Sequence, residues 1–279
     1  MLDRRLTMRL SADTLPRPAD MSNYRNGAVL YVKSYLLIRT VVGIIGIALP
    51  IILMFGEASL KGSVHARGSL SAYYHSPMQD AFVGSLCVVG FLLLTYMAGQ
   101  PRTVDFWFSN LAGVAVLGVV FLPTSRPDIP TGAPLCGPHT LPEPPSCSPV
   151  ESTLGEMPTA RAHAVCAAIF ILSLAVICCA FAYREHKLGP HGFWWKFHAV
   201  CAGLIVLAVG WVFLGDALKY DIVGLKSLYV GEVVSVWSFG ASWFAKGDGL
   251  RTLLLRPIPS QTPGADADID PQVKHAEVR

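Results

Sequence analysis

Long apolar stretches without charge alternate with short polar connectors along this chain. Each stretch is close to the roughly 17–25 residues that a helix needs to cross a hydrocarbon core about 30 Å thick. The period-two alternation typical of membrane β-barrel strands is absent from them. The pattern therefore predicts an all-α integral membrane protein, a bundle of six transmembrane helices at 36–55, 81–98, 106–123, 162–183, 197–217 and 228–245.

The polar segments divide the rest of the chain around this bundle. No secretory signal peptide is expected, because the first 33 residues lack an apolar core of the required length. Translation is expected to start at Met1 or at Met21. Nine prolines between the third and fourth stretches favour extended segments and no helix. We expect a partly disordered N-terminal tail at 1–33 and a disordered C-terminal tail at 246–279. Between them we expect a membrane domain at 34–245, which contains the proline-rich loop 124–161.

Composition strengthens the membrane assignment. The chain is 52% hydrophobic and only 15% charged, whereas soluble domains carry about 25% charged residues. We expect the lipid bilayer to be its main partner and expect no nucleic acid. The oligomeric state stays open.

Basic residues predict the orientation. If the six stretches all cross, 16 of the 22 Lys and Arg residues lie on the side of the two termini. The positive-inside rule then places both termini in the cytoplasm and the protein in the inner or plasma membrane. Arg39, near the inner end of the first stretch, is expected to reach toward the headgroups, and His198 to anchor the fifth stretch at the interface.

The seven cysteines agree with this orientation. Five lie inside the apolar stretches, where a thiol behaves as a small apolar residue. Cys136 and Cys147 share the proline-rich loop, which the orientation places outside, in a compartment that permits disulfides. We expect them to form a disulfide, with two free thiols as the alternative.

Polar residues gather at the outer ends of the predicted helices. Ionisable groups at membrane depth are costly and are the first candidates for function. Three hypotheses compete: helix capping and mutual pairing, with Asp80 capping the second helix; a pocket for a lipid headgroup or small polar ligand; and a metal-dependent hydrolase. The candidate residues are Ser69, Ser71, Tyr74, His75, Asp80, Thr124, His163, Asp216 and Glu232.

The hydrolase hypothesis has a motif behind it. Ser71 and His75 form an S-x-x-x-H element in "SAYYH". This element resembles one in the superfamily of alkaline ceramidases, adiponectin receptors and hemolysin-III proteins. The resemblance implies zinc, seven spans and an H-x-x-x-H pair in the last span, yet the last stretch here has no histidine. A zinc site in this chain would have to use His75, His163, Asp216 and Glu232.

A second resemblance covers more of the chain. The segments "GSLSAYYHSPMQDAFVGSL", "AGVAVLGVVFLPT" and "RAHAVCAAIFIL" follow one another in this order. Together they resemble a bacterial six-span membrane protein family of unknown function related to DRAM/Sfk-type proteins. The resemblance spans 34–245 and implies the six-span topology without an assigned reaction.

The sequence thus favours a non-enzymatic six-span protein with an outward-facing polar pocket for a lipid headgroup or small ligand. A metal-dependent hydrolase of a lipid amide or ester is the alternative. A transporter is a third class, which would need polar residues through the membrane midplane. The predicted cytoplasmic halves are too apolar to favour it.

Overall fold

The structure, a computed structural model, is helical over the part of the chain that it describes. That part comprises residues 18–63, 66–96, 102–127, 129, 132–142, 144, 146–189, 192–219, 221 and 225–247, with side chains from Ser34 onward. The long helices are α1 (Pro18–Lys61), α2 (Gln79–Thr95), α3 (Val104–Phe121), α5 (Glu156–Leu188), α6 (Phe193–Leu218) and α7 (Ser227–Gly247). A 3-10 helix, η2 (Ser71–His75), precedes α2, and a short helix, α4 (Pro149–Leu154), precedes α5. The all-α class is confirmed.

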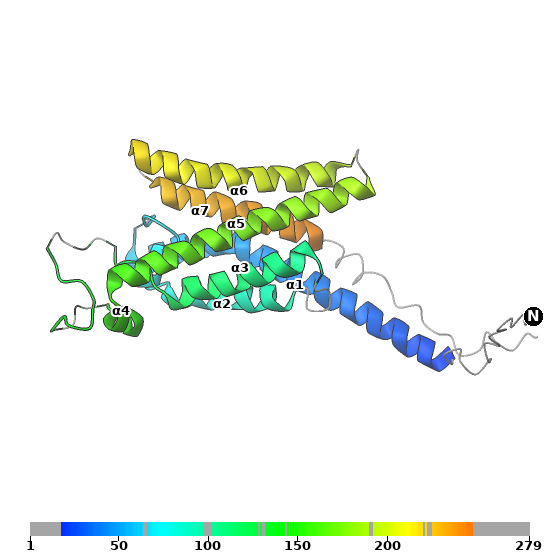
Figure 1. The fold of residues 1–279 in the computed structure, drawn as a ribbon, viewed down its shortest axis with the longest axis horizontal. Coiled ribbons are helices and arrows are strands. Elements are labelled where there is room, and N and C mark those ends of the chain that lie inside the picture. The colour runs from blue at the N-terminus through cyan, green and yellow to red at the C-terminus, as the bar shows by residue number, and fades with distance from the viewer. Residues whose placement is uncertain are drawn as a thin grey trace, which may run out of the picture.

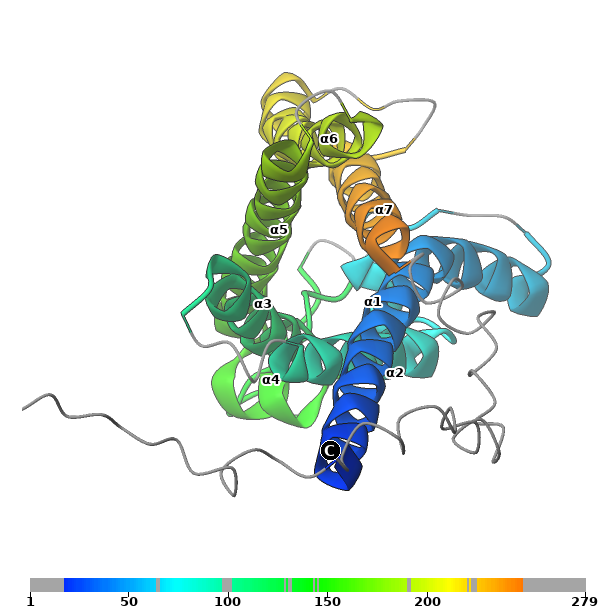
Figure 2. The ribbon, with the colours of Figure 1, turned by 90° about the vertical axis from the view of Figure 1, so that its right-hand side faces the viewer.

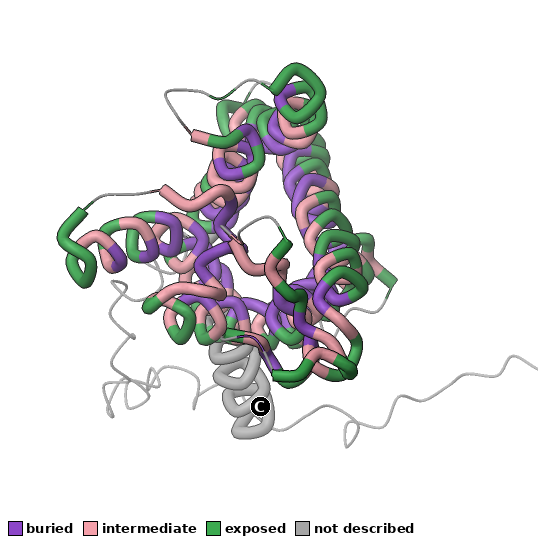
Figure 3. The backbone as a smooth tube through the Cα atoms, turned by 90° about the vertical axis from the view of Figure 1, so that its left-hand side faces the viewer, coloured by how far each residue is buried: buried purple, intermediate pink, exposed green. Residues whose placement is uncertain are grey.

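The long helices form a closed ring. Each packs mainly against two neighbours, in the order α1, α2, α3, α5, α6, α7 and back to α1, as the end-on view in Figure 2 shows. Figure 3 views the opposite end, where exposed residues lie on the outward faces of the ring and buried residues on the faces between helices. The connectors before α2 and after α3 lie at this opposite end, which we call the outer end; the other is the inner end.

Four of these helices are long and apolar enough to cross a membrane: the Ser34–Lys61 part of α1, and all of α3, α5 and α6. Helix α2 is apolar but has 17 residues, and α7 is not among the four. The ring carries large apolar side chains on its outside, such as Phe91, Val114 and Leu207, which are 60%, 62% and 70% exposed. Such a surface is unusual in a water-soluble monomer and suits contact with lipid. The chain therefore has the features of a helical membrane protein.

Small residues let α1 and α7 touch at the backbone. A Cβ added to Gly43 would lie 2.6 Å from the Phe244 nitrogen, and one added to Gly240 would lie 3.0 Å from the Gly43 oxygen. Close backbone approach of this kind maximises van der Waals contact where no hydrophobic drive operates between helices. A larger residue at either glycine would force the two helices apart.

Two helix starts differ from the sequence-based expectation. Helix α1 begins at Pro18, so residues 18–33, assigned to a partly disordered tail, are helical. Helix α5 begins at Glu156 instead of residue 162. Its Pro158 lies in the first turn, where a missing N–H leaves no helical bond unmade. The predicted tails at 1–17 and from 248 onward lie outside the described residues.

The proline-rich connector contains a helix, so the expectation that it holds none is wrong. Ser148 caps α4: its hydroxyl accepts from the Glu151 N–H, and the Glu151 carboxylate accepts from the Ser148 N–H. Pro149 occupies the first helical position, where its fixed φ suits a helix and its missing N–H is not needed. This reciprocal cap outweighs the surrounding prolines.

Candidate functional site

Two adjacent cavities occupy the outer half of the ring. The first, which we call the vestibule, has a volume of about 1080 Å³ and lies at the outer ends of α1, α6 and α7. The second, the chamber, has a volume of about 310 Å³ and lies deeper, between α5, α6 and α7. The two adjoin, because they share the lining residues Ser69, Thr124, Val212, Phe213 and Leu228.

Charged side chains line the vestibule. Its cations are Lys61, Arg67, Arg126, Lys219 and Lys226, and its carboxylates are Glu57, Asp216 and Asp221. Glu57 is 4% exposed, and its carboxylate lies 2.6 Å from the Arg67 guanidinium and 2.8 Å from the Lys61 ammonium group. Two cations therefore share one carboxylate in this wall.

The chamber is mainly apolar. Helix α5 supplies a row of small side chains to it, α6 supplies Ala208, Val209, Val212 and Phe213, and α7 supplies Leu228 and Gly231. In Figure 1, α5 and α6 lie close at the inner end and diverge toward the outer end, and residues of both helices line the chamber. Its polar lining residues are Ser69, Ser71, Thr124, His163, Glu232 and Ser235.

Glu232 joins α7 to η2. Its carboxylate accepts the Leu70 N–H at 2.6 Å and the Ser71 hydroxyl at 3.5 Å. The N–H groups at the start of a helix lack helical partners, so a carboxylate there satisfies a donor and suits the local dipole. This contact fixes η2 over the entrance to the chamber.

His163 faces the chamber from α5. It is 4% exposed, and its Nδ1 lies 2.6 Å from the Leu122 carbonyl oxygen. A carbonyl only accepts, so Nδ1 donates, and in the neutral imidazole Nε2 keeps its lone pair. Within the described residues Nε2 has no hydrogen-bond partner.

His75 has a related structural role. Its Nε2 donates to the Thr124 carbonyl oxygen at 2.7 Å. The last carbonyls of a helix need donors from outside the helix. His163 donates to the carbonyl of Leu122, the residue that caps the end of α3, and His75 donates to that of Thr124 in the connector after it. This use of the two histidines was not predicted from the sequence.

The structure brings together most of the predicted site residues and leaves out three. Ser69, Ser71, Thr124, His163 and Glu232 line the chamber, and Asp216 lines the vestibule. The three that line neither cavity are Tyr74, His75 and Asp80.

The capping hypothesis required Asp80 to cap α2, but Asp80 does not occupy the capping position. The residue at the capping position is Met78, without a side-chain bond, and Asp80 is exposed in the first turn. Tyr74 packs edge-on against His75, and burial raises the pKa of its hydroxyl.

The residues proposed as zinc ligands do not fit a metal. No three side chains of His, Cys, Asp or Glu converge as ligands anywhere in the described part of the chain. His75 and His163 bind the carbonyls after α3, Glu232 binds η2, and Asp216 lies at the mouth of the vestibule. These four side chains therefore lie at separate places and do not form one set of metal ligands.

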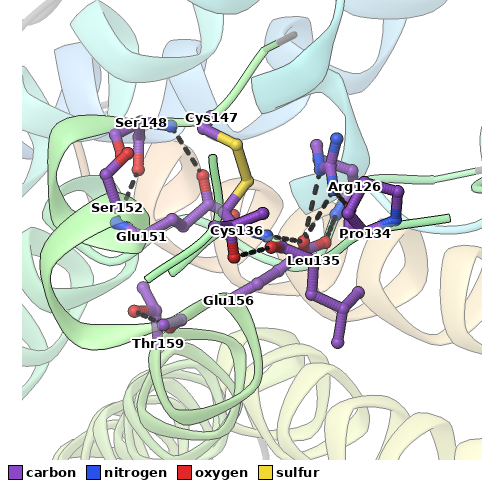
Figure 4. The surroundings of a disulfide bond; sticks show 12 residues. Arg126, Pro134, Leu135, Cys136, Cys147, Ser148, Glu151, Ser152, Glu156 and Thr159 are labelled. Atoms are coloured by element: carbon purple, nitrogen blue, oxygen red, sulfur yellow. Dashed lines mark hydrogen bonds and ion pairs between the residues drawn. A yellow bond between two sulfur atoms is a disulfide. The ribbon is translucent and has the colours of Figure 1, made fainter. Parts of the chain in front are cut away.

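The outer connector is held by a buried carboxylate and a disulfide (Figure 4). Glu156 accepts from the Arg126 N–H at 2.9 Å, from the Arg126 guanidinium at 3.0 Å and from the Cys136 N–H at 3.1 Å. Cys136 and Cys147 form a disulfide. These contacts fasten the connector to the start of α5, beside the vestibule.

Sequence reasoning missed Glu57 and Arg67 as part of the site. Glu57 and Lys61 are four residues apart, a spacing that predicts an ion pair on a helix. Arg67 comes six residues after the end of α1, and its approach to Glu57 depends on the turn between them. The sequence gives no direct signal of that approach.

Arg39 is buried at the inner end, contrary to the expectation that it reaches the headgroups. It is 8% exposed and donates to the hydroxyls of Tyr35 and Tyr96. Its guanidinium lies 4.2, 5.3 and 5.1 Å from the ring centroids of Tyr35, Tyr96 and Phe181. These rings take the place of water around the charge.

Further polar contacts close the inner end. Arg184 on α5 pairs with the buried Asp105 on α3 at 2.5 Å. Its neighbour Glu185 pairs with Lys246 on α7. The inner end is thus more polar than expected.

His198 is also placed differently from the expectation. It is 1% exposed, and its Nδ1 lies 2.8 Å from the Ser242 hydroxyl oxygen. Its ring packs against Phe181 and Phe197. His198 therefore joins α6 to α7 in the interior instead of anchoring α6 at the interface.

Comparisons with protein-family models, curated proteins and solved structures found no match for this chain. The functional argument therefore rests on the geometry of the vestibule and the chamber.

Proposed function

We propose that this chain is a six-span protein of the inner or plasma membrane, with both termini in the cytoplasm and a cavity that binds a lipid headgroup or small ligand from outside. The six long helices support the topology, since α2 and α7 are the neighbours that close the ring formed with the four apolar helices. The bias of 16 of 22 basic residues toward the side of the termini supports the orientation. The six-span family that the sequence resembles has the same topology.

One observation carries the binding function: a charged vestibule adjoins a mainly apolar chamber with a few fixed polar groups. Ligand sites combine these features, with volumes of about 300–1,000 Å³, apolar walls and a small number of placed polar atoms. Glu232 and His163 supply such atoms in the chamber. Helix caps alone would not require a cavity.

Native mass spectrometry of the purified protein tests this function. We expect a co-purifying molecule at up to one copy per chain. Ala168→Phe, which fills the chamber from α5, should remove it. Ala217→Phe is the matched control, because Ala217 is exposed near the end of α6 and lines neither cavity. The proposal would be contradicted if both variants retained the molecule to the same extent. It would also be contradicted if neither the variants nor the unmodified protein carried a bound molecule.

A metal-dependent hydrolase has less support, because the side chains that it requires as metal ligands do not converge on one point. A transporter has gained an argument, because buried ionisable groups do occur at the inner end. The pairs Asp105–Arg184 and Glu185–Lys246 join helices at that end, and transport past them would require them to separate. Proteoliposomes that bind a labelled amphiphile without moving it across the bilayer would eliminate this candidate.

A further inference from the structure

The vestibule wall has more cations than carboxylates. Lys61 and Arg67 share Glu57, and Arg126 pairs with Glu156. The other two cations, Lys219 and Lys226, share the vestibule with the carboxylates Asp216 and Asp221, and no ion pair within the described residues includes either lysine. They come from two sides of the vestibule, Lys219 from the end of α6 and Lys226 from just before α7.

Lys226 is positioned beside the entrance to the chamber. A Cβ added to Gly68 would lie 3.1 Å from its Cδ and 3.4 Å from its Nζ. The ammonium group therefore lies over the backbone of Gly68, next to Ser69, which lines both cavities. A positive charge at this point faces a ligand that bridges the vestibule and the chamber.

The chamber has the length and chemistry for an acyl chain. It extends from Ala160 to Ile171 along α5, which is about 16 Å at 1.5 Å per residue. That depth is about half of a hydrocarbon core roughly 30 Å thick. Its walls over this depth are mostly Ala, Val, Ile, Leu and Phe side chains.

A chain could enter the chamber sideways from the bilayer. Ala164 and Ala168 on α5 are exposed although they line the chamber, and Phe213 on α6 is 73% exposed. Helices α5 and α6, which both line the chamber, diverge toward the outer end (Figure 1). An acyl tail would thus pass from lipid to chamber without crossing water.

We propose that the ligand is an anionic amphiphile, with a phosphate-bearing headgroup between Lys219 and Lys226 in the vestibule and one acyl chain in the chamber. This proposal rests on the proposed binding function and specifies its ligand class. The mainly apolar lining of the chamber sets the orientation, because a charged headgroup there would lose its hydration without gaining a partner charge. The headgroup stays outside and the tail inside.

The direct test measures binding of four probes to the protein in detergent: lysophosphatidic acid, lysophosphatidylcholine, a monoacylglycerol and inorganic phosphate. Microscale thermophoresis gives each Kd. We expect saturable binding of lysophosphatidic acid, at least tenfold tighter than binding of the other three. Because exposed charges are screened by salt, the Kd should rise severalfold between about 0.05 and 0.5 M NaCl.

Paired variants locate the two halves of the ligand. Lys219→Gln with Lys226→Gln should weaken lysophosphatidic acid binding at least tenfold, whereas Lys187→Gln at the inner end should not change it. Ala168→Leu should weaken binding of every single-chain probe. The control Ala217→Leu adds the same volume outside the cavities.

Each failure has its own meaning. If lysophosphatidylcholine or the monoacylglycerol binds as tightly and Ala168→Leu weakens it, the cavity binds amphiphiles but the anionic class is wrong. If inorganic phosphate binds as tightly as lysophosphatidic acid, the acyl chain plays no part and the proposal is overturned. If no probe binds and Ala168→Phe leaves the co-purifying species unchanged, the proposed binding function fails as well.

Discussion

Arg39 shows how far a single residue can depart from what its sequence position indicates. A lone arginine near the end of an apolar stretch favours a side chain that reaches water. In the fold, aromatic rings from α1, from the C-cap of α2 and from α5 surround its guanidinium. Tyr96 and Phe181 are distant in sequence, so nothing local to Arg39 predicts them. The interior of the ring, not the interface, determines where this charge lies.

Replacing Arg39 with lysine should destabilise the protein although the charge is kept. Lysine lacks the planar guanidinium that stacks on Tyr35 while donating to Tyr96. Losing about 1–2 kcal/mol of such contacts should lower the thermal midpoint in detergent by about 3–6 °C. The control Arg102→Lys alters an exposed residue and should leave the midpoint unchanged. Equal midpoints for the two variants would show that the aromatic contacts contribute nothing.

Glu232 is the residue on which the sequence and the structure agree best. Its position one turn into α7 made it a candidate, and it lines the chamber. The sequence could not identify its partner, because Leu70 precedes it by 162 residues. Only the packing of the connector before α2 onto α7 brings the two together.

Removing the Glu232 carboxylate should loosen η2. Glu232→Ala leaves the Leu70 N–H without its acceptor, and a bond to a charged group is worth about 1.5–3 kcal/mol. Hydrogen exchange of the amides at 70–75 should therefore accelerate by roughly 10- to 100-fold. Ser235→Ala, one turn further along α7, removes a hydroxyl bonded only within its own helix. The same acceleration in Ser235→Ala would refute the proposed contact.

At the scale of elements, the apolar stretches predicted the long helices well and their ends poorly. The membrane requirement for about 20 apolar residues identifies a core of each helix. It says nothing of polar extensions such as Pro18–Lys33 of α1. Polar ends depend on caps and on contacts such as that of Glu156 with the connector. The cap of α4, Ser148 with Glu151, could be predicted from the sequence. The density of prolines around it led instead to the wrong expectation that the connector holds no helix.

The disulfide should hold the outer connector without holding the ring. Cys136 and Cys147 are 11 residues apart, and closing a short loop in this way is worth about 2–4 kcal/mol. The double variant Cys136→Ser, Cys147→Ser should become sensitive to limited proteolysis within 132–148. Cys179→Ser, which removes an exposed free thiol, should resist cleavage as the unmodified protein does. Cleavage that spreads at once into α5 or α6 would show that the disulfide supports the ring as well.

At the scale of the whole molecule, hydropathy predicted the helical class and the outer polar site but not the ring. Apolar periodicity does not say which helices are neighbours, because every stretch is apolar around most of its circumference. The ring order depends on close contacts such as Gly43 with Phe244 and on ion pairs between distant helices.

Orientation of the whole ring is the last prediction, and it decides from which side the ligand comes. In a background with Cys179→Ala, single cysteines replace Ser63 or Lys226 at the outer end and Lys187 at the inner end. Cells treated with a membrane-impermeant maleimide should label Ser63→Cys and Lys226→Cys without permeabilisation, and Lys187→Cys only after it. The expectation follows from the 16 of 22 basic residues on the inner side, because such residues resist translocation. Reversed labelling would place the vestibule in the cytoplasm and the ligand in the inner leaflet.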